Sequence, residues 1–177
     1  MIAAGHAVVA LPGASAVLAG LTMSGLPTDS FFFGGFLPAR QTARRTRLEQ
    51  LATVPASLVL FESPSRLADA LGDIAATLGA REVVVARELT KHFEEIRRGS
   101  AADLSRDIEA TGVKGEIVLV IAPPPPREAS DDDIIAALHR EMATSSLRDA
   151  ARMVADDLGA ARSRVYQIGL RLKDARP

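Results

Sequence analysis

Three charged side chains, Arg87, Glu88 and Lys91, directly follow an apolar run at residues 83–86. A carboxylate flanked by cations can transfer a proton or line a polar pocket, and a position at the end of a predicted strand favours a pocket wall. Solvated surface networks have the same composition and no chemical role. From these residues alone, both interpretations remain open.

Glu62 closes a second apolar run, and Arg66 follows in the first turn of an expected helix. The two side chains could pair with each other or face a ligand near the helix amides, and the spacing favours neither. Lys114 and Glu116 flank the start of the last apolar run. Because a glutamate that enters a buried strand needs a partner, we expect this second pair to be structural.

Small residues from Pro12 to Ala16 connect an expected strand at Ala7–Leu11 to an expected helix. Ligands of α/β proteins bind outside the carboxyl ends of strands, where a helix N-terminus offers free amides. Ser15 as an ordinary helix cap explains the same residues, and spacing alone favours that simpler interpretation.

Arginines gather locally, although 21 basic and 22 acidic side chains give the chain a net charge of only −1. A site for a polyanion must therefore be a local cluster. The helix expected at residues 40–53 carries such a cluster, and the strand near residue 97 adds two more arginines. These side chains could hold RNA phosphates, whereas a solubilising helix face is the more common arrangement. The cluster consists of Arg40, Arg44, Arg45, Arg47, Arg97 and Arg98.

The composition excludes several kinds of site. Cysteine is absent from the 177 residues, which excludes disulfides, thiolate zinc and a cysteine nucleophile and fits a reducing cytoplasm. The histidines lack metal-ligand spacing, and the dinucleotide fingerprint, Walker loop and nucleophile elbow are missing. The apolar N-terminal stretch lacks a charged leader and is interrupted at Pro12 and Gly13. We therefore expect a cytoplasmic protein with no metal and no membrane partner.

The elements that must position these residues alternate at first and then become helical. Apolar runs predict strands at residues 7–11, 31–36, 57–61, 82–86, 93–98 and 115–122. Helical spacing predicts helices at 14–25, 40–53, 64–78 and 101–110, and then at 131–142, 146–157 and 161–172. Strands alternating with helices, followed by helices alone, indicate an α/β domain and a small three-helix unit.

The last two predicted helices have the outline of a helix-turn-helix. The turn falls at Gly159, and the second helix carries Arg162, Ser163, Arg164 and Tyr166, which could touch nucleic acid. Three-helix units are also common as packing devices, and the residues alone favour that interpretation.

Six motifs occur in one order along the chain. They are Leu11-Pro-Gly-Ala-Ser-Ala, Gly25-Leu-Pro, Phe33-Gly-Gly-Phe-Leu-Pro, Phe61-Glu-Ser-Pro-Ser-Arg, Ala86-Arg-Glu-Leu-Thr-Lys and Lys114-Gly-Glu. In this order they resemble the tetrapyrrole-methylase superfamily, and more closely its branch of ribosomal RNA 2'-O-ribose methyltransferases. The likeness covers nearly the whole chain, including the helical C-terminal unit.

The resemblance implies a division of the chain. Members of the superfamily have two α/β domains with S-adenosylmethionine in the cleft between them, and this sequence is similar to the second half. Residues 1–12 would then end a mostly missing N-terminal methylase domain, and residues 13–122 would form the C-terminal αβα domain with a mixed sheet. Residues 123–130 would be a Pro-rich linker and residues 131–177 the helical unit. A fragment of this kind would be expected to lack half of the cofactor site and to be inactive alone.

The resemblance also implies roles for individual residues. The implied S-adenosylmethionine contacts fall on Ser15, Ala16, Glu62 and Leu89. The implied RNA-binding side chains, taken from the motifs and the basic helix, are Arg44, Arg45, Arg66, Arg87 and Thr90.

The implied reaction is methylation of a cytidine 2'-hydroxyl in small-subunit ribosomal RNA. The enzyme must align oxygen, carbon and sulfur, and that alignment is the larger contribution to the rate. A base, if one is used, would be a carboxylate or a lysine of lowered pKa, and Glu88 and Lys91 are the candidates.

Two other functions remain open. A porphyrin-type methylase would share the fold but needs a large apolar cleft, whereas this chain offers arginine-rich faces. A non-catalytic RNA-binding or dimerisation module would fit a half-enzyme. A homodimer is expected, because related enzymes pair and the phenylalanine-rich strand at residues 31–36 could lie near a partner.

Overall fold

The computed structural model describes residues 1–125 and 128–174. These residues form two compact units, Met1–Pro125 and Pro126–Pro177. Each unit has its own buried apolar core, so each is described by itself.

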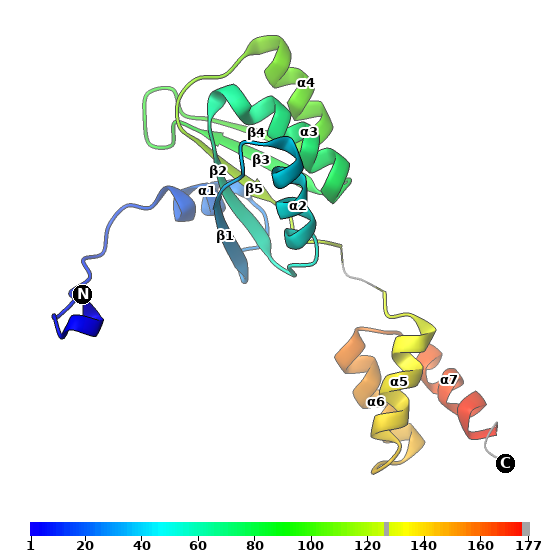
Figure 1. The fold of residues 1–177 in the computed structure, drawn as a ribbon. Helices are drawn as coiled ribbons and strands as arrows, with labels where there is room; N and C mark the ends of the chain where they lie inside the picture. The colour runs from blue at the N-terminus through cyan, green and yellow to red at the C-terminus, as the bar shows by residue number, and fades with distance from the viewer. Residues whose placement is uncertain (126–127, 175–177) are drawn as a thin grey trace. The chain divides into compact units, whose positions relative to one another are not determined.

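The first unit contains a five-stranded sheet in the order β1-β2-β5-β3-β4 (Figure 1). Its strands are β1 (Phe31–Phe36), β2 (Ser57–Glu62), β3 (Glu82–Arg87), β4 (Glu95–Ser100) and β5 (Ile117–Ile121). β1 pairs with β2 in parallel, and the other neighbours pair antiparallel. The predicted α/β class with a mixed sheet is confirmed.

The register brings two candidate residues to one edge of the sheet. Both β2 and β3 run antiparallel to β5, so they point in the same direction. Glu62 at the end of β2 and Arg87 at the end of β3 are both paired with Ile117 of β5. The charged residues that follow these two strands therefore share an edge.

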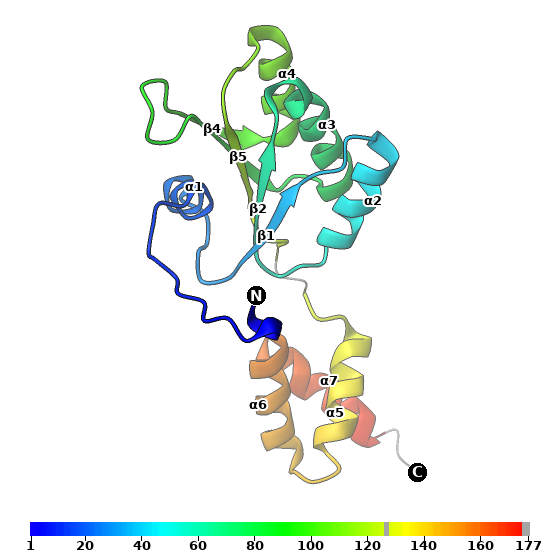
Figure 2. The ribbon, with the colours of Figure 1, turned by 60° about the vertical axis from the view of Figure 1, so that its left-hand side comes forward.

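Helices cover both faces of this sheet (Figure 2). In residues 1–125 they are α1 (Ala16–Ser24), α2 (Gln41–Leu51), α3 (Leu67–Leu78) and α4 (Ala101–Thr111). α2, α3 and α4 lie on one face, where the stripe Leu67, Leu71 and Ile74 of α3 is fully buried. α1 lies on the other face, and an added Cβ at Gly20 would be 2.8 Å from Val118 Cγ1. The small residue thus allows α1 to lie close to β5.

The strand predicted at Ala7–Leu11 is wrong. These residues are irregular and exposed in the structure, and 88% of Leu11 is accessible to solvent. An apolar run becomes a strand only where a neighbouring strand satisfies its backbone groups. Among the described residues, no strand pairs with this segment.

The second unit is a bundle of α5 (Asp131–Glu141), α6 (Leu147–Leu158) and α7 (Arg162–Asp174), which confirms the predicted three-helix unit. Ser130 and Asp133 form a capping box at the start of α5, and Ser146 caps α6. The predicted linker and the end of the helical unit include residues 126–127 and 175–177, which lie outside the described residues.

The described residues contain no helix long and apolar enough to cross a membrane. Within the same residues, no group of three or more His, Cys, Asp or Glu side chains could hold a metal ion.

Candidate functional site

The loop after β3 has an unusual backbone. Glu88 has φ 49° and Thr90 has φ 65°, the left-handed conformation that non-glycine residues rarely adopt. The loop is held by the amide of Thr90, which donates to Glu94 Oε2 at 2.6 Å, and by Lys91 N, which donates to Glu88 O at 2.9 Å. Such strain persists only where the surrounding contacts fix the chain.

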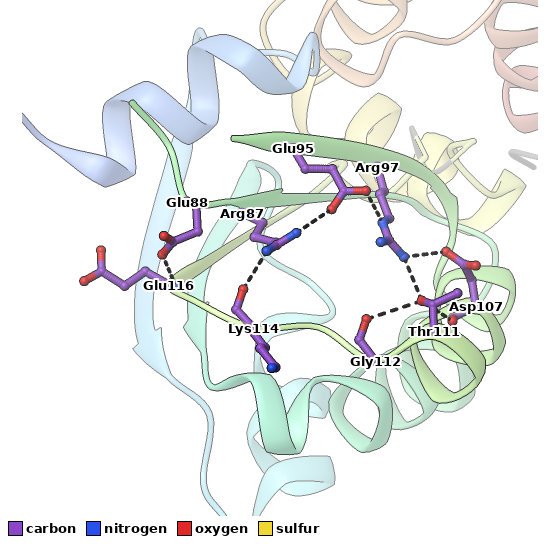
Figure 3. Close-up of polar contacts among 9 residues, drawn as sticks. All are labelled: Arg87, Glu88, Glu95, Arg97, Asp107, Thr111, Gly112, Lys114 and Glu116. Carbon is purple, nitrogen blue, oxygen red and sulfur yellow. Dashed lines mark hydrogen bonds and ion pairs between the residues drawn. The ribbon is translucent and has the colours of Figure 1, made fainter. Parts of the chain in front are cut away.

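Glu88 joins this loop to the start of β5 (Figure 3). The Glu88 amide donates to Glu116 O at 2.9 Å, and the Glu116 amide donates to Glu88 Oε1 at 2.8 Å. Lys91 Nζ lies 3.0 Å from Glu88 Oε1 and 3.2 Å from Glu116 Oε2. One ammonium group therefore bridges two carboxylates at the edge of the sheet.

These contacts shift the pKa values of Glu88 and Lys91 in opposite directions. The hydrogen bond from the Glu116 amide, together with Lys91, lowers the pKa of Glu88. Hydrogen bonds to Glu88 and Glu116 raise the pKa of Lys91. A base role would need a lowered pKa at Lys91, whereas this arrangement raises it. The geometry therefore favours a protonated Lys91 that positions the two acids.

A second polar network lies next to this cluster and was missed from the sequence. Arg87 Nε donates to Lys114 O at 2.6 Å, and Arg87 Nη1 donates to Glu95 Oε2 at 3.1 Å (Figure 3). Arg97 donates to Glu95 at 2.8 Å and to Asp107 at 2.7 Å. The first of these bonds, with help from Arg87, lowers the pKa of Glu95. Glu95 and Arg97, which have opposite charges and lie two residues apart on β4, were the available signal.

Glu62 is buried on the α3 face of the sheet. Its Oε1 accepts from the Ser63 amide at 2.7 Å and lies 2.6 Å from Arg66 Nη2. Its Oε2 is buried and has no hydrogen-bond partner among the described residues. A buried carboxylate oxygen without a donor is costly, so this atom has an unused capacity to accept one hydrogen bond.

Ser15, Ala16 and Leu89 lie on the opposite face, which α1 covers. Leu89 Cδ1 is 3.6 Å from the Cβ position of Gly20, and Ala16 precedes Gly20 by one helical turn. Ser15 Oγ accepts from Leu18 N at 3.4 Å, which leaves the first two amides of α1 as open donors.

The direction of α1 brings its N-terminus to the charged edge. Near its other end, Ser24 O accepts from Arg98 Nε at 3.1 Å, and Arg98 is paired with Val84 near the start of β3. α1 therefore begins near the carboxyl ends of β2 and β3. The structure brings Ser15, Ala16 and Leu89 to one face of this edge, and it places Glu62 on the other face.

The two predicted RNA-binding arginines of α2 bind a carboxylate. Arg44 Nε and Arg45 Nε lie 2.6 and 2.7 Å from the two carboxyl oxygens of Asp73 in α3. The Arg44 side chain is 4% exposed, whereas the Arg45 side chain is 50% exposed. Arg44 therefore fixes α2 to α3, and only Arg45 retains a surface that RNA could reach.

The fold and this edge define a class of protein. It is an α/β domain with charged loops after two strands that end at the same edge, and a helical unit follows this domain in the chain. The chain belongs to the tetrapyrrole methylase family, because the model of the Tetrapyrrole (Corrin/Porphyrin) Methylases matches residues 2–105. The model of the RsmI C-terminal HTH domain matches residues 128–173.

Individual relatives agree with this membership. The chain is 46% identical over 166 residues to ribosomal RNA small subunit methyltransferase I of Erythrobacter litoralis, and 44% identical over 176 residues to that of Mesorhizobium japonicum. The matches cover 94% and 96% of this chain but 59% and 58% of those proteins. The solved methyltransferase CobJ has the same fold, with a TM-score of 0.52 and 19% identity over 72% of this chain and 55% of that one.

Proposed function

We propose that this chain is part of an S-adenosylmethionine-dependent methyltransferase that methylates the 2'-hydroxyl of a cytidine in small-subunit ribosomal RNA. The relatives that match over nearly the whole chain are named as methyltransferases of that RNA. The motifs at the two strand ends carry the resemblance to the 2'-O-ribose branch.

The unpartnered oxygen of Glu62 is the observation that supports a ligand at this edge. S-adenosylmethionine carries hydroxyl, amino and ammonium donors, and each of them could satisfy Glu62 Oε2. On the other face, the open amides at the start of α1 and the backbone of Leu89 would hold acceptor groups of the cofactor. When bound, the cofactor supplies the methyl group and leaves as S-adenosylhomocysteine.

The other residues of the edge would orient the substrate. At the edge, Arg66, Arg87 and Thr90 would hold RNA phosphates and ribose oxygens, and Arg45 on α2 would add a further contact. The Glu88–Lys91 pair would fix the loop that carries Thr90. Among these groups Glu88 is the one that could accept the ribose proton, although its lowered pKa makes it a weak base. The main contribution of this chain is then alignment of the 2'-hydroxyl with the methyl group.

Calorimetry with S-adenosylmethionine tests the cofactor assignment. The titration uses this chain and the same chain extended with the unmatched part of the Erythrobacter litoralis relative. We expect the extended chain to bind and the Glu62→Gln variant to bind about tenfold more weakly, because one charged hydrogen bond is lost. Glu109→Gln on the exposed side of α4 is the matched control and should bind like the unchanged protein. Failure of both forms to bind would contradict the proposal.

We also propose a homodimer through the edge strand β1. Phe31, Phe33 and Phe36 are exposed, the last at 62%. Phe33 packs edge-on against Phe61 and Phe36 packs against it at a tilt, with ring centroids 5.0 and 5.6 Å apart. Edge strands with exposed apolar side chains tend to associate. Sedimentation of the chain should give a dimer, and Phe36→Ser should shift it to a monomer. A monomer for the unchanged chain would contradict this assignment.

A further inference from the structure

A cleft of about 940 Å³ lies between α6 and α7 in the second unit. Its polar lining comes from both helices. Arg148 and Arg152 lie one turn apart on α6, and Arg162, Ser163 and Tyr166 lie in the first turns of α7. This unit is separate from the edge discussed above, and the proposed reaction uses none of these residues.

The guanidinium groups of the cleft have free donors. Among the described residues, neither Arg148 nor Arg162 has an acidic partner within 4.0 Å. Arg152 is 3.9 Å from Asp149, whose carboxylate already accepts from the Ser146 cap at 2.6 Å. Asp149 is the one carboxylate in the lining. By contrast, Arg164 outside the cleft lies 2.6 Å from Asp131. The cleft is therefore a concave patch of positive charge.

An aromatic ring accompanies these cations. Tyr166 is the single tyrosine of a chain without tryptophan, and 39% of it is exposed. It follows Arg162 by one helical turn, so ring and guanidinium share a side of α7. Cations beside an exposed ring are the combination that holds a nucleic-acid strand, with phosphates on the arginines and a base stacked on the ring.

The distance between the helices depends on a small residue. A Cβ at Gly169 of α7 would clash with Leu147 Cδ1 of α6. Gly169 therefore allows α7 to pack closely on the start of α6, next to Arg148. The buried side chains Ala150, Ala151 and Val165 complete this contact. The positions of the cleft side chains are thus set by a packed core and not by a loop.

We infer that the cleft between α6 and α7 binds the sugar–phosphate backbone of RNA, with phosphates on Arg148, Arg152 and Arg162 and one base stacked on Tyr166. The choice of RNA over DNA rests on the proposed function, whereas the binding of a phosphodiester strand follows from the cleft itself. The second unit then supplies affinity for the substrate apart from the methylation site.

The test measures binding of a fluorescein-labelled RNA of about 20 nucleotides to the full chain at several salt concentrations. Arg148→Gln combined with Arg162→Gln should reduce the slope of log K against log salt by about 1.4, because two phosphate contacts are lost. The affinity at physiological salt should fall about tenfold. Tyr166→Leu should also cost about tenfold, and Tyr166→Phe should have no effect because the ring remains.

Arg140→Gln is the control, because it removes one arginine from α5 outside the cleft, half of the charge that the double variant removes. Circular dichroism verifies that each variant folds. Unchanged affinity and slope in the double arginine variant would overturn the inference, as would an equal effect of Arg140→Gln or no RNA binding by the unchanged chain. Tighter binding of DNA of the same sequence, with the same dependence on the arginines, would overturn the assignment to RNA. If the cleft binds RNA but neither this chain nor its extended form binds S-adenosylmethionine, the proposed function is refuted and this inference still stands.

Discussion

Gly115 lies directly against the side chain of Glu88. A Cβ at position 115 would be 2.5 Å from the Glu88 Cγ, Cδ and Oε1 atoms, and Gly115 has φ 96°. The next amide, that of Glu116, donates to Glu88 Oε1 at 2.8 Å. The glycine of the Lys-Gly-Glu motif therefore makes room for the carboxylate that connects β5 to the strained loop after β3.

Gly115→Ala is expected to destabilise the first unit by about 2–4 kcal/mol, since both the positive φ and the contact with Glu88 are unfavourable for alanine. Urea unfolding followed by far-UV circular dichroism measures the change. Tyr166 lies in the second unit and is the single tyrosine, so its fluorescence reports that unit separately.

Gly25→Ala is the control for this prediction. Gly25 has φ 76° and ψ 5°, the ordinary left-handed end of a helix, and a Cβ there would meet nothing within 4 Å. Only the backbone cost of about 1 kcal/mol is then expected. Equal losses in the two variants would show that the contact with Glu88 contributes nothing.

Asp73→Asn is expected to cost about 3 kcal/mol in the free energy of unfolding, because it leaves the buried Arg44 guanidinium without its carboxylate. Asp69→Asn removes an exposed carboxylate from the first turn of the same helix and should cost less than about 1 kcal/mol. The same urea experiment compares the two variants. A small effect at Asp73 would mean that the ion pairs of Asp73 with Arg44 and Arg45 contribute little to holding α2 against α3.

The loss of unfolding free energy at low pH should depend on Asp73. Burial raises the pKa of this carboxyl, but the hydrogen bonds from Arg45 and Arg44 outweigh it, and the net pKa is lowered. Its contribution is therefore complete above the unfolded pKa of about 3.9 and is lost as the pH falls through the lower folded value. Unfolding free energies measured between neutral pH and about pH 3 should fall less steeply in Asp73→Asn. An unchanged slope would contradict the lowered pKa.

The sequence predicts most elements of this fold because their signals are local. The apolar strands β2, β3 and β5 and the buried stripe of α3 are confirmed at nearly the expected residues. β4 begins at Glu95, two residues later than expected, because the loop after β3 extends to Glu94. The error at Ala7–Leu11 has the opposite origin, since pairing with a neighbouring strand is not local.

The candidate site is predictable to a smaller extent. The strand ends place Glu62 and Arg87 at one edge, as the alternation of elements implies. The pairing of Arg44 with Asp73 joins residues 29 positions apart, and no local pattern indicates it. The left-handed backbone of Thr90 runs against the preference of a β-branched residue, so its sequence signal is misleading.

Gly20→Ala is expected to weaken the contact between α1 and the sheet. Alanine favours a helix over glycine by about 1 kcal/mol, but its Cβ would lie 2.8 Å from Val118 Cγ1, and overpacking costs about 1–3 kcal/mol. Val118→Ala removes the methyl group that clashes. In the Val118→Ala background the Cβ of residue 118 remains 3.2 Å from the added Cβ, so Gly20→Ala should cost less than in the unchanged protein. The expected coupling energy is about 1–2 kcal/mol in the double-mutant cycle. If the effects of Gly20→Ala and Val118→Ala on the free energy of unfolding are additive, the two side chains do not touch and α1 lies farther from β5.

Lys91→Arg distinguishes a positioning cation from a base. The raised pKa of Lys91 keeps the side chain protonated at neutral pH, and arginine can also bridge Glu88 and Glu116. In the chain extended with the unmatched part of the relative, we expect Lys91→Arg to keep the rate of methyl transfer within about threefold, since loss of a general base typically costs at least a hundredfold. Lys91→Met, which cannot bridge the two acids, should lower the rate further while the pH profile keeps its shape. A hundredfold loss in Lys91→Arg, or the disappearance of one limb of the pH profile, would identify Lys91 as the base.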